Sequence, residues 1–366
     1  MKKNKKKMMS FILAMVMVLA LAACGGGSGS GSGSSSGGSS SDSASSGDTS
    51  GGGSAAEAMN IKVSTVLTEA SISGQALNKF KEEIESKSDG RISVDVYYNG
   101  VLGSTDAVLD MAAEGDVQMM SMNPVAMETQ VVELATLDQY YMFDDLDHAH
   151  RFLEGEGGQY LRDAYQKAGL QGLATFGLGF RQLSNNNNEV KTIADMQGLT
   201  LRGYSPIQIA AWQAIGATPT SVDWNELFVS MQQGLLDGQE AALSTINDFS
   251  FYEVQKYVTL TDHVFTCDDI LADKVWYEGL NAEDKALVDD AMQVAYEWQK
   301  QAYQDDLKNL EEKFTNEYGM TITTLDDSVK AEMAEKMAAA NMHEIIKVCG
   351  QEIYDKVLGY VEAARG

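Results

Sequence analysis

The sequence NAEDKALVDDAMQVAYEWQKQAYQDDLKNLEEKFTNEY at Asn281–Tyr318 says more about the fold than any other stretch of the chain. It contains no Gly or Pro, and its apolar residues recur at helical spacing. Asn281 is a favoured N-cap residue, and Glu283 and Asp284 stand in the first turn, where the helix dipole stabilises carboxylates. Gly319 follows as a suitable C′ residue, so we predict a helix over the whole stretch. The apolar positions are Leu287, Met292, Ala295, Trp298, Ala302, Leu310 and Phe314.

The length of this helix sets the scale of the fold. About 37 helical residues at 1.5 Å each span roughly 55 Å, which exceeds the diameter of one lobe in a body of this size. We therefore expect the helix to run along two lobes. The alternative is a pair of helices with a break near Asp305.

The segments before this helix predict two α/β units in series. In the first unit, strand patterns at 59–67, 91–97 and 117–122 alternate with helix patterns at 74–86 and 105–114. This order predicts an α/β lobe with a largely parallel sheet. The second unit has predicted strands at 172–177 and 200–202, predicted helices at 206–214 and 225–233, and an apolar run at 241–246.

The first 24 residues have the features of a bacterial lipoprotein signal peptide. Five lysines precede an apolar run from about Phe11 to Ala23, which is short for a bilayer span. The run ends in Leu-Ala-Ala-Cys, which resembles the bacterial lipobox. We predict that residues 1–23 are removed and that Cys24 carries the lipid, since two acyl chains give stable anchoring. The alternative is an ordinary signal peptide followed by a chance cysteine.

Residues 24–58 are predicted to tether the folded part to the membrane. Gly and Ser make up 26 of the 30 residues from 25 to 54, a composition that cannot bury enough apolar surface to offset its ordering entropy. A Gly-rich coil over 25–58 has a root-mean-square reach of roughly 30 Å. We expect an extracytoplasmic protein held at the outer face of the cytoplasmic membrane.

The charge of the chain excludes several classes of partner. The formal net charge of the 366 residues is −26, and it is −31 without the five lysines of the leader. Such a surface repels phosphate backbones, so we expect no nucleic-acid binding. Adhesion to anionic lipid by surface charge is equally excluded, which leaves the lipid anchor as the only predicted contact with the membrane.

The sequence offers no positive argument for an enzyme. The four histidines fit no H-E-x-x-H pattern, and no paired C-x-x-C, EF-hand, P-loop or G-x-S-x-G motif is present. We predict no catalytic residue, no metal site and no cofactor. Cys267 and Cys349 could form one disulfide in an oxidising exterior, or they could be free, buried thiols.

Arginine is scarce in this acidic chain, so its positions are informative. Only six are present, and two of them, Arg181 and Arg202, lie in apolar stretches. A guanidinium in an apolar setting needs an anion, and its planar fork suits a carboxylate. The anion could belong to a ligand, or it could be one of the 53 acidic side chains of the chain itself.

At these residues the chain resembles the substrate-binding proteins of TRAP transporters, the DctP-type family, from about Asn60 to Val361. The resemblance rests on several ordered stretches rather than on one motif. They are SDGRI at 88–92, YNGVLG at 98–103, GFRQLSN at 179–185, IADMQGLTLR at 193–202, LLDGQE at 235–240 and FYEVQKY at 251–257.

The resemblance implies an α/β, two-lobed periplasmic-binding-protein-like fold of type II. Such a fold has a central cleft and one long helix that spans both lobes. Residues 59–179 with about 268–305 are expected in lobe I, and residues 180–267 with about 306–366 in lobe II. We expect a monomer that binds a small carboxylate by lobe closure and delivers it to the TRAP membrane permease subunits.

The resemblance also implies a set of ligand-binding residues. The arginine of the family's L-R-x-P stretch pairs with the ligand carboxylate, which carries over to Arg202, and the arginine of G-F-R-Q lies in the cleft, which carries over to Arg181. The other residues expected at the cleft are Trp224, Ser121, Asn123 and Ala241.

The chain departs from the family pattern at positions that bear on the ligand. Leu178 and Ala241 stand where the family often has asparagine, Ala242 replaces Pro, and Gly203-Tyr204 replaces Val-Pro. Loss of two amide side chains removes partners for ligand hydroxyls, and an unpaired buried hydroxyl costs about 1–3 kcal/mol. This favours a less hydroxylated carboxylate over sialic acid and uronates. The alternative function is that of a sensor that presents its carboxylate to a receptor kinase.

Overall fold

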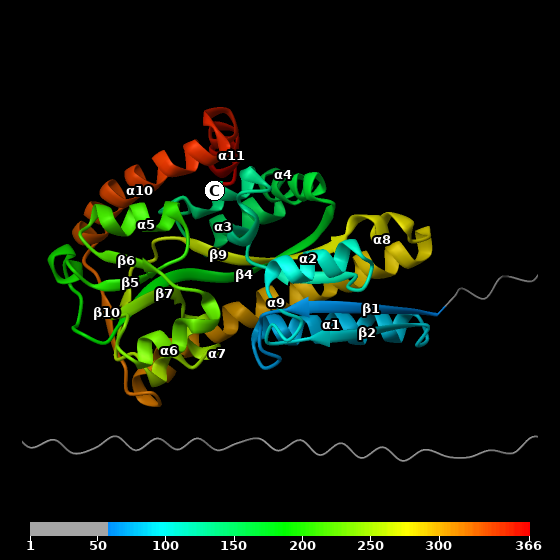
Figure 1. The fold of residues 1–366 in the computed structure, drawn as a ribbon, viewed down its shortest axis with the longest axis horizontal. Helices are drawn as coiled ribbons and strands as arrows, with labels where there is room; N and C mark the ends of the chain where they lie inside the picture. Colours follow the sequence, from blue (N-terminus) through cyan, green and yellow to red (C-terminus); the bar gives the residue numbers. More distant parts are fainter. Residues whose placement is uncertain (1–57) are drawn as a thin grey trace, which may run out of the picture. The chain divides into compact units, whose positions relative to one another are not determined.

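The computed structural model describes residues 58–366 (Figure 1). The predictions made for the signal peptide, for Cys24 and for the tether up to residue 57 lie outside the described residues.

The first unit has the predicted β-α-β-α-β order. Strand β1 (Met59–Thr65) is followed by α1 (Ile72–Lys87), β2 (Ile92–Tyr97), α2 (Thr105–Ala113) and β3 (Met119–Met122). The strands lie in the order β2-β1-β3, and both pairs are parallel, as predicted. The buried residues of β1 and β2 pack with the apolar face of α1 in one core.

Two long antiparallel strands connect the first unit to the second. Strand β9 (Phe265–Asp273) lies between β3 and β4 (Leu170–Asn185) and is antiparallel to both. The strand predicted at 172–177 is shorter than β4. The prediction ended it at Gly177 because the sequence Gly177-Leu178-Gly179 is typical of a strand end. The strand instead continues through a register shift between Gly177 and Gly179. Gly179 has φ +97°, and a Cβ there would overlap the hydroxyl of Tyr303 on the long helix.

The second unit extends the same sheet beyond β4. Its elements are β5 (Thr200–Gly203), α5 (Pro206–Ala214), β6 (Thr218–Ser221), α6 (Leu227–Gln232), β7 (Gly238–Ala242), α7 (Leu243–Asp248), β8 (Tyr257–Leu260) and β10 (Thr321–Thr324). The helix predicted at 225–233 begins as a 3₁₀ turn, Trp224–Glu226, before α6. The apolar run at 241–246 divides between the end of β7 and α7.

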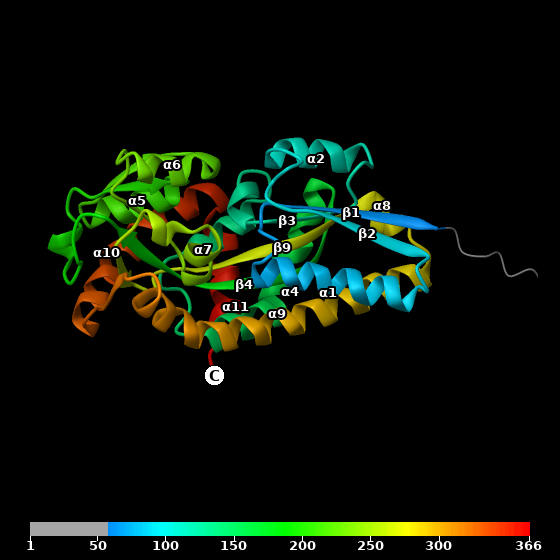
Figure 2. The same ribbon diagram turned by 90° about the horizontal axis from the view of Figure 1, so that it is seen from below.

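The long helix is continuous, as predicted. Helix α9 (Ala282–Asn316) has 35 residues and begins after Asn281, whose side chain accepts a hydrogen bond from the Asp284 amide at 2.9 Å. Its N-terminal half buries Val288 and Met292 in the core of the first unit, and its C-terminal half buries Phe314 in the core around β8. Figure 2 shows it passing from α1 to α7.

The remaining helices pack around the sheet, with α8 at the far end of the first unit (Figure 1). They are α3 (Leu146–Glu154), α4 (Glu156–Ala164), α8 (Lys274–Gly279), α10 (Asp327–Cys349) and α11 (Gln351–Ala363). Helix α10 packs on α5, whereas α11 contacts α3 and α4 (Figure 1).

The exact division of the chain between two lobes stays a prediction. Cys267 and Cys349 are both buried free thiols.

Two features are absent from the described part of the chain. From residue 58 onward, no helix is long and apolar enough to cross a membrane. Within the same residues, no group of three or more His, Cys, Asp or Glu side chains is arranged to hold a metal ion.

Candidate functional site

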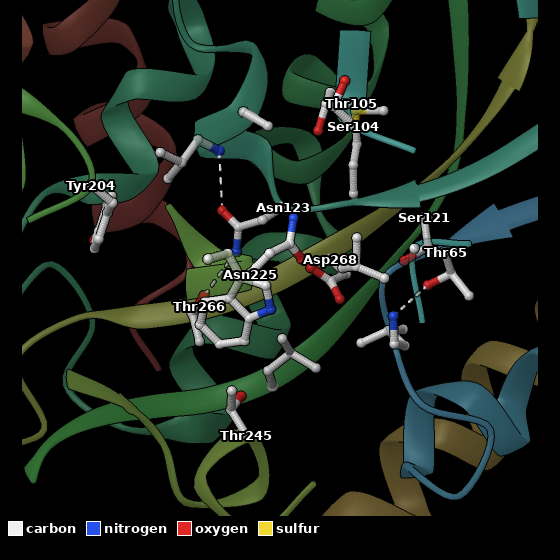
Figure 3. A pocket seen from close by; sticks show the side chains of 18 of the residues that line it. Thr65, Ser104, Thr105, Ser121, Asn123, Tyr204, Asn225, Thr245, Thr266 and Asp268 are labelled. Atoms are coloured by element: carbon white, nitrogen blue, oxygen red, sulfur yellow. Dashed lines mark hydrogen bonds between the residues drawn. The ribbon is translucent and has the colours of Figure 1, made fainter. Parts of the chain in front are cut away.

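A cleft of about 500 Å³ lies where segments of both units meet (Figure 3). The first unit contributes the residues that follow β1, the start of α2 and the end of β3. The second contributes the end of β5, the turn at 223–225 and part of α7. The connecting strands contribute the middle of β4 and the first half of β9. Of the charged side chains that line the cleft, Asp106 and Asp223 are exposed to solvent, whereas Arg181, Arg202, Asp138 and Asp268 are largely buried.

Arg202 presents an unsatisfied guanidinium to this cleft. Its Nε donates a hydrogen bond to the Val222 carbonyl oxygen at 3.1 Å, which leaves the two terminal nitrogens for other acceptors. Within residues 58–366, no carboxylate lies in ion-pair contact with it. Burial and then the charge of Arg181 lower the pKa of Arg202 to about 10. An anion bound here would offset both effects, because a nearby opposite charge favours the charged form of the guanidinium.

Two aromatic rings hold the Arg202 side chain in place. Its Cζ lies 5.4 Å from the centroid of the Tyr204 ring and 5.3 Å from that of Trp224, within the range of cation–π attraction. Trp224 is itself fixed by an edge-on contact with Phe249, with 4.9 Å between ring centroids. The fork of Arg202 is therefore preorganised for a planar anion.

Arg181, in contrast, is already paired inside the protein. Its Nε donates to Glu240 Oε2 and its Nη2 to the Glu240 carbonyl oxygen. The Nε2 of His263 lies 3.1 Å from the same Oε2. Burial alone raises the pKa of Glu240, but the charge of Arg181 and the contact with His263 outweigh it and lower that pKa. This buried network neutralises much of the charge of Arg181.

Five of the six residues predicted from the sequence line the cleft: Ser121, Asn123, Arg181, Arg202 and Trp224. Asn123 is largely occupied by its own neighbours, because its Nδ2 donates to Thr266 Oγ1 and the Cys267 carbonyl and its Oδ1 caps the Val125 amide. Ala241 is fully buried in the core around β7 and is not among the lining residues.

Sequence reasoning did not single out Asp268 or Tyr204 as site residues. Burial, with the neighbouring charge of Asp269, raises the pKa of Asp268 to about 7, while Arg181 opposes that rise. The signal was present in the sequence Phe265–Ala272, where two acids interrupt an otherwise apolar strand. Tyr204 was noted only as a departure from Pro.

Comparison with protein families gives one match over most of the chain. Residues 63–346 match the family described as "Bacterial extracellular solute-binding protein, family 7", DctP. A solute-binding protein of Verminephrobacter eiseniae is 32% identical over 290 residues, which is 79% of this chain and 85% of that protein. The C4-dicarboxylate-binding protein DctB of Bacillus subtilis is 29% identical over 277 residues, which is 75% of this chain and 79% of that protein.

Solved structures agree with this match. The sugar acid binding protein DctPAm of Advenella mimigardefordensis, in complex with galactonate, superposes with a TM-score of 0.79 at 26% identity and covers 84% of this chain and 99% of that one. A TRAP periplasmic solute-binding protein of Sulfurospirillum deleyianum with bound succinate superposes with a TM-score of 0.75 at 26% identity. This match covers 82% of this chain and 98% of that one. The chain therefore belongs to the DctP family of bacterial extracellular solute-binding proteins and has the two-lobed type II fold of the TRAP solute-binding proteins.

Proposed function

We propose that this protein is the lipid-anchored receptor of a TRAP transporter, which captures an organic acid outside the membrane and delivers it to the membrane permease subunits. The observation that carries the proposal is Arg202, a guanidinium that lines the cleft between two aromatic rings without a carboxylate partner among the described residues. A ligand carboxylate would accept two parallel hydrogen bonds from its terminal nitrogens.

The ligands named for related proteins support an organic acid as the class. They include succinate and galactonate in two solved structures and C4-dicarboxylates for the Bacillus protein. The lining of this cleft favours a ligand with few hydroxyl groups. Leu178 presents an apolar side chain where the family often has an amide, and Ala241 presents none to the cleft.

Capture proceeds by closure of the two lobes on the ligand. Strands β4 and β9 connect the lobes, and the register shift beside Gly179 is a point at which they can bend. Closure excludes water from the cleft, which lowers the local dielectric and strengthens the pairing of Arg202 with the ligand. The closed form then presents a different surface to the permease.

A thermal-shift screen of the purified protein against mono- and dicarboxylates tests the ligand class. Any compound that binds the folded state selectively raises the melting temperature, and its stabilising free energy grows with the logarithm of its concentration over Kd. We expect one or more carboxylates to raise it and neutral sugars and cations to leave it unchanged. A response confined to neutral or cationic compounds would contradict the proposed function.

Ligand binding should change the fluorescence of Trp224, because this ring lies at the cleft beside Arg202. The chain has three other tryptophans, Trp212, Trp276 and Trp298, so the variant Trp224→Phe is the necessary control. We expect most of the ligand-induced change to disappear in that variant. If the full change persists, Trp224 lies outside the binding site.

Replacement of Cys24 by alanine should prevent anchoring of the protein. The variant has no thiol to receive diacylglycerol, so it should accumulate as precursor or appear in the medium. Fractionation followed by mass measurement of the mature chain checks this result. A variant with the same membrane fraction and the same mature mass as the wild type would exclude lipidation at Cys24.

A further inference from the structure

Asp268 is a buried acid for which the protein itself provides no partner. Its side chain lines the cleft and is only 4% exposed (Figure 3). Among the described residues, no side chain or backbone group donates a hydrogen bond to it, and no basic group forms an ion pair with it. A nearly buried carboxylate without a donor in the protein is costly to keep charged, so Asp268 depends for its hydrogen bonds on the water of the cleft or on a ligand.

The next residue of the same strand shows what a structural acid looks like in this fold. Asp269 points to the opposite face of β9, since side chains alternate along a strand. It accepts hydrogen bonds from Tyr165 Oη and Thr175 Oγ1, each at 2.6 Å. The fold thus satisfies both oxygens of Asp269 from within and leaves those of Asp268 to the cleft.

A second polar group on the same wall is also without a partner. Ser121, on the neighbouring strand β3, lines the cleft and is 5% exposed, and its Oγ has no hydrogen-bond partner in the described part of the chain. Asp138, the other buried acid at the cleft, does have one, because the Ser205 hydroxyl lies 3.4 Å from its Oδ2. Among the described residues of this wall, Asp268 and Ser121 are therefore the buried polar side chains without a hydrogen-bond partner, and both lie on strands of the first unit.

Among the described residues, the cleft thus holds a buried cation without an ion-pair partner, Arg202, and a buried acid without a hydrogen-bond donor, Asp268. Arg202 belongs to the second unit and Asp268 to the first-unit end of β9. Arg181 does not serve as the partner of Asp268, because it is bonded to Glu240. A ligand with a carboxylate at one end and a hydrogen-bond donor at the other would satisfy both groups on closure. A dicarboxylate would bring its second negative charge against Asp268.

We propose that Asp268 and Ser121 form a subsite for the donor end of the ligand, so that the substrate class is a carboxylate with a terminal ammonium or hydroxyl group rather than a dicarboxylate. This inference rests on the proposed function, because it takes Arg202 as the anchor of the carboxylate end.

A matched series of probes tests it by titration calorimetry on the purified full-length protein. The four-carbon set is butyrate, 4-hydroxybutyrate, 4-aminobutyrate and succinate. A six-carbon set with the same end groups tests a greater distance between the two ends of the ligand. Within a set, the donor-bearing acids should bind about tenfold or more tightly than the unsubstituted acid and the diacid, which is the effect of one hydrogen bond to a charged group. The ammonium and hydroxyl members distinguish a cationic from a neutral donor.

The variant Asp268→Asn should remove this preference with little change in shape. We expect the ratio of the affinity for a donor-bearing acid to the affinity for the diacid to fall about tenfold or more. The variant should bind the diacid as tightly as the wild type does, or more tightly. Ser121→Ala, which removes a hydroxyl without a partner in the described chain, is the second variant and should lower donor-acid affinity without loss of melting temperature. The matched control is Asp269→Asn, which should lower the melting temperature while the preference for the donor-bearing acid persists.

The outcomes separate this inference from the function on which it rests. If acids bind in a manner that depends on Arg202 but Asp268→Asn leaves the affinity ratio unchanged, the subsite is wrong and the proposed function stands. The same conclusion follows if the diacid binds most tightly to the wild type. If no acid of either set binds to the wild type, both are overturned.

Discussion

Replacement of Arg202 by alanine should weaken carboxylate binding by roughly 30-fold to several-thousand-fold. The change leaves a ligand carboxylate inside the closed cleft without its partner, and loss of one member of a buried charge pair costs about 2–5 kcal/mol. Lysine keeps the charge but lacks the planar pair of donors, so the affinity of Arg202→Lys should lie between those of alanine and the wild type. Titration calorimetry on the three proteins measures this order.

The ligand-free Arg202→Ala protein should melt close to the wild type. Arg202 has no ion pair within residues 58–366, and the one hydrogen bond of its guanidinium to these residues goes to the Val222 carbonyl oxygen. The substitution removes two cation–π contacts, but it also removes the desolvation cost of a buried charge without an ion-pair partner, and these two effects oppose each other. A clearly destabilised ligand-free protein with near-normal affinity would mean that Arg202 is structural.

Replacement of Arg181 by alanine should have the opposite signature, with a large loss of stability before any ligand is added. Glu240 would remain buried with its negative charge uncompensated except by His263. Removal of one partner of a buried pair costs about 3–5 kcal/mol. Chemical denaturation of the ligand-free variant measures the change in the free energy of unfolding.

The double variant Arg181→Met, Glu240→Gln serves as the control for this effect. It removes both charges, and the amide of glutamine can still bond to His263, so much of the lost stability should return. Wild-type stability in Arg181→Ala, together with lost ligand affinity, would instead make Arg181 a direct anchor of the ligand.

The contrast between these two arginines also shows what the sequence could and could not predict. Both were identified as scarce cations in apolar stretches, and both line the cleft. The sequence alone could not tell which of them had an internal partner, because Glu240 reaches Arg181 only through the antiparallel pairing of β4 with β7. That pairing joins residues 59 positions apart in the chain.

Local signals predicted the helices well and the strands between the lobes less well. Helix α9 was predicted almost to its ends, because an uninterrupted helical pattern and a capping residue are local features. Strand β4 was cut short at its glycines, since only the tertiary structure reveals a register shift where a strand end is expected. Asp268 was missed for a related reason: which of two adjacent acids faces a cleft depends on the strand register.

The most direct test of Arg202 as the anchor of the ligand carboxylate compares one ligand acid with its own amide. The carboxylate that gives the largest thermal shift in the screen is titrated, beside the neutral amide of the same skeleton, into the wild type and into Arg202→Ala. We expect the acid to bind the wild type and the amide to bind it at least 30-fold more weakly, because loss of one charge of a buried pair costs at least about 2 kcal/mol. We expect Arg202→Ala to bind both compounds weakly and with similar affinity. Equal affinity of the wild type for acid and amide, or full retention of the preference for the acid in Arg202→Ala, would contradict this role of Arg202.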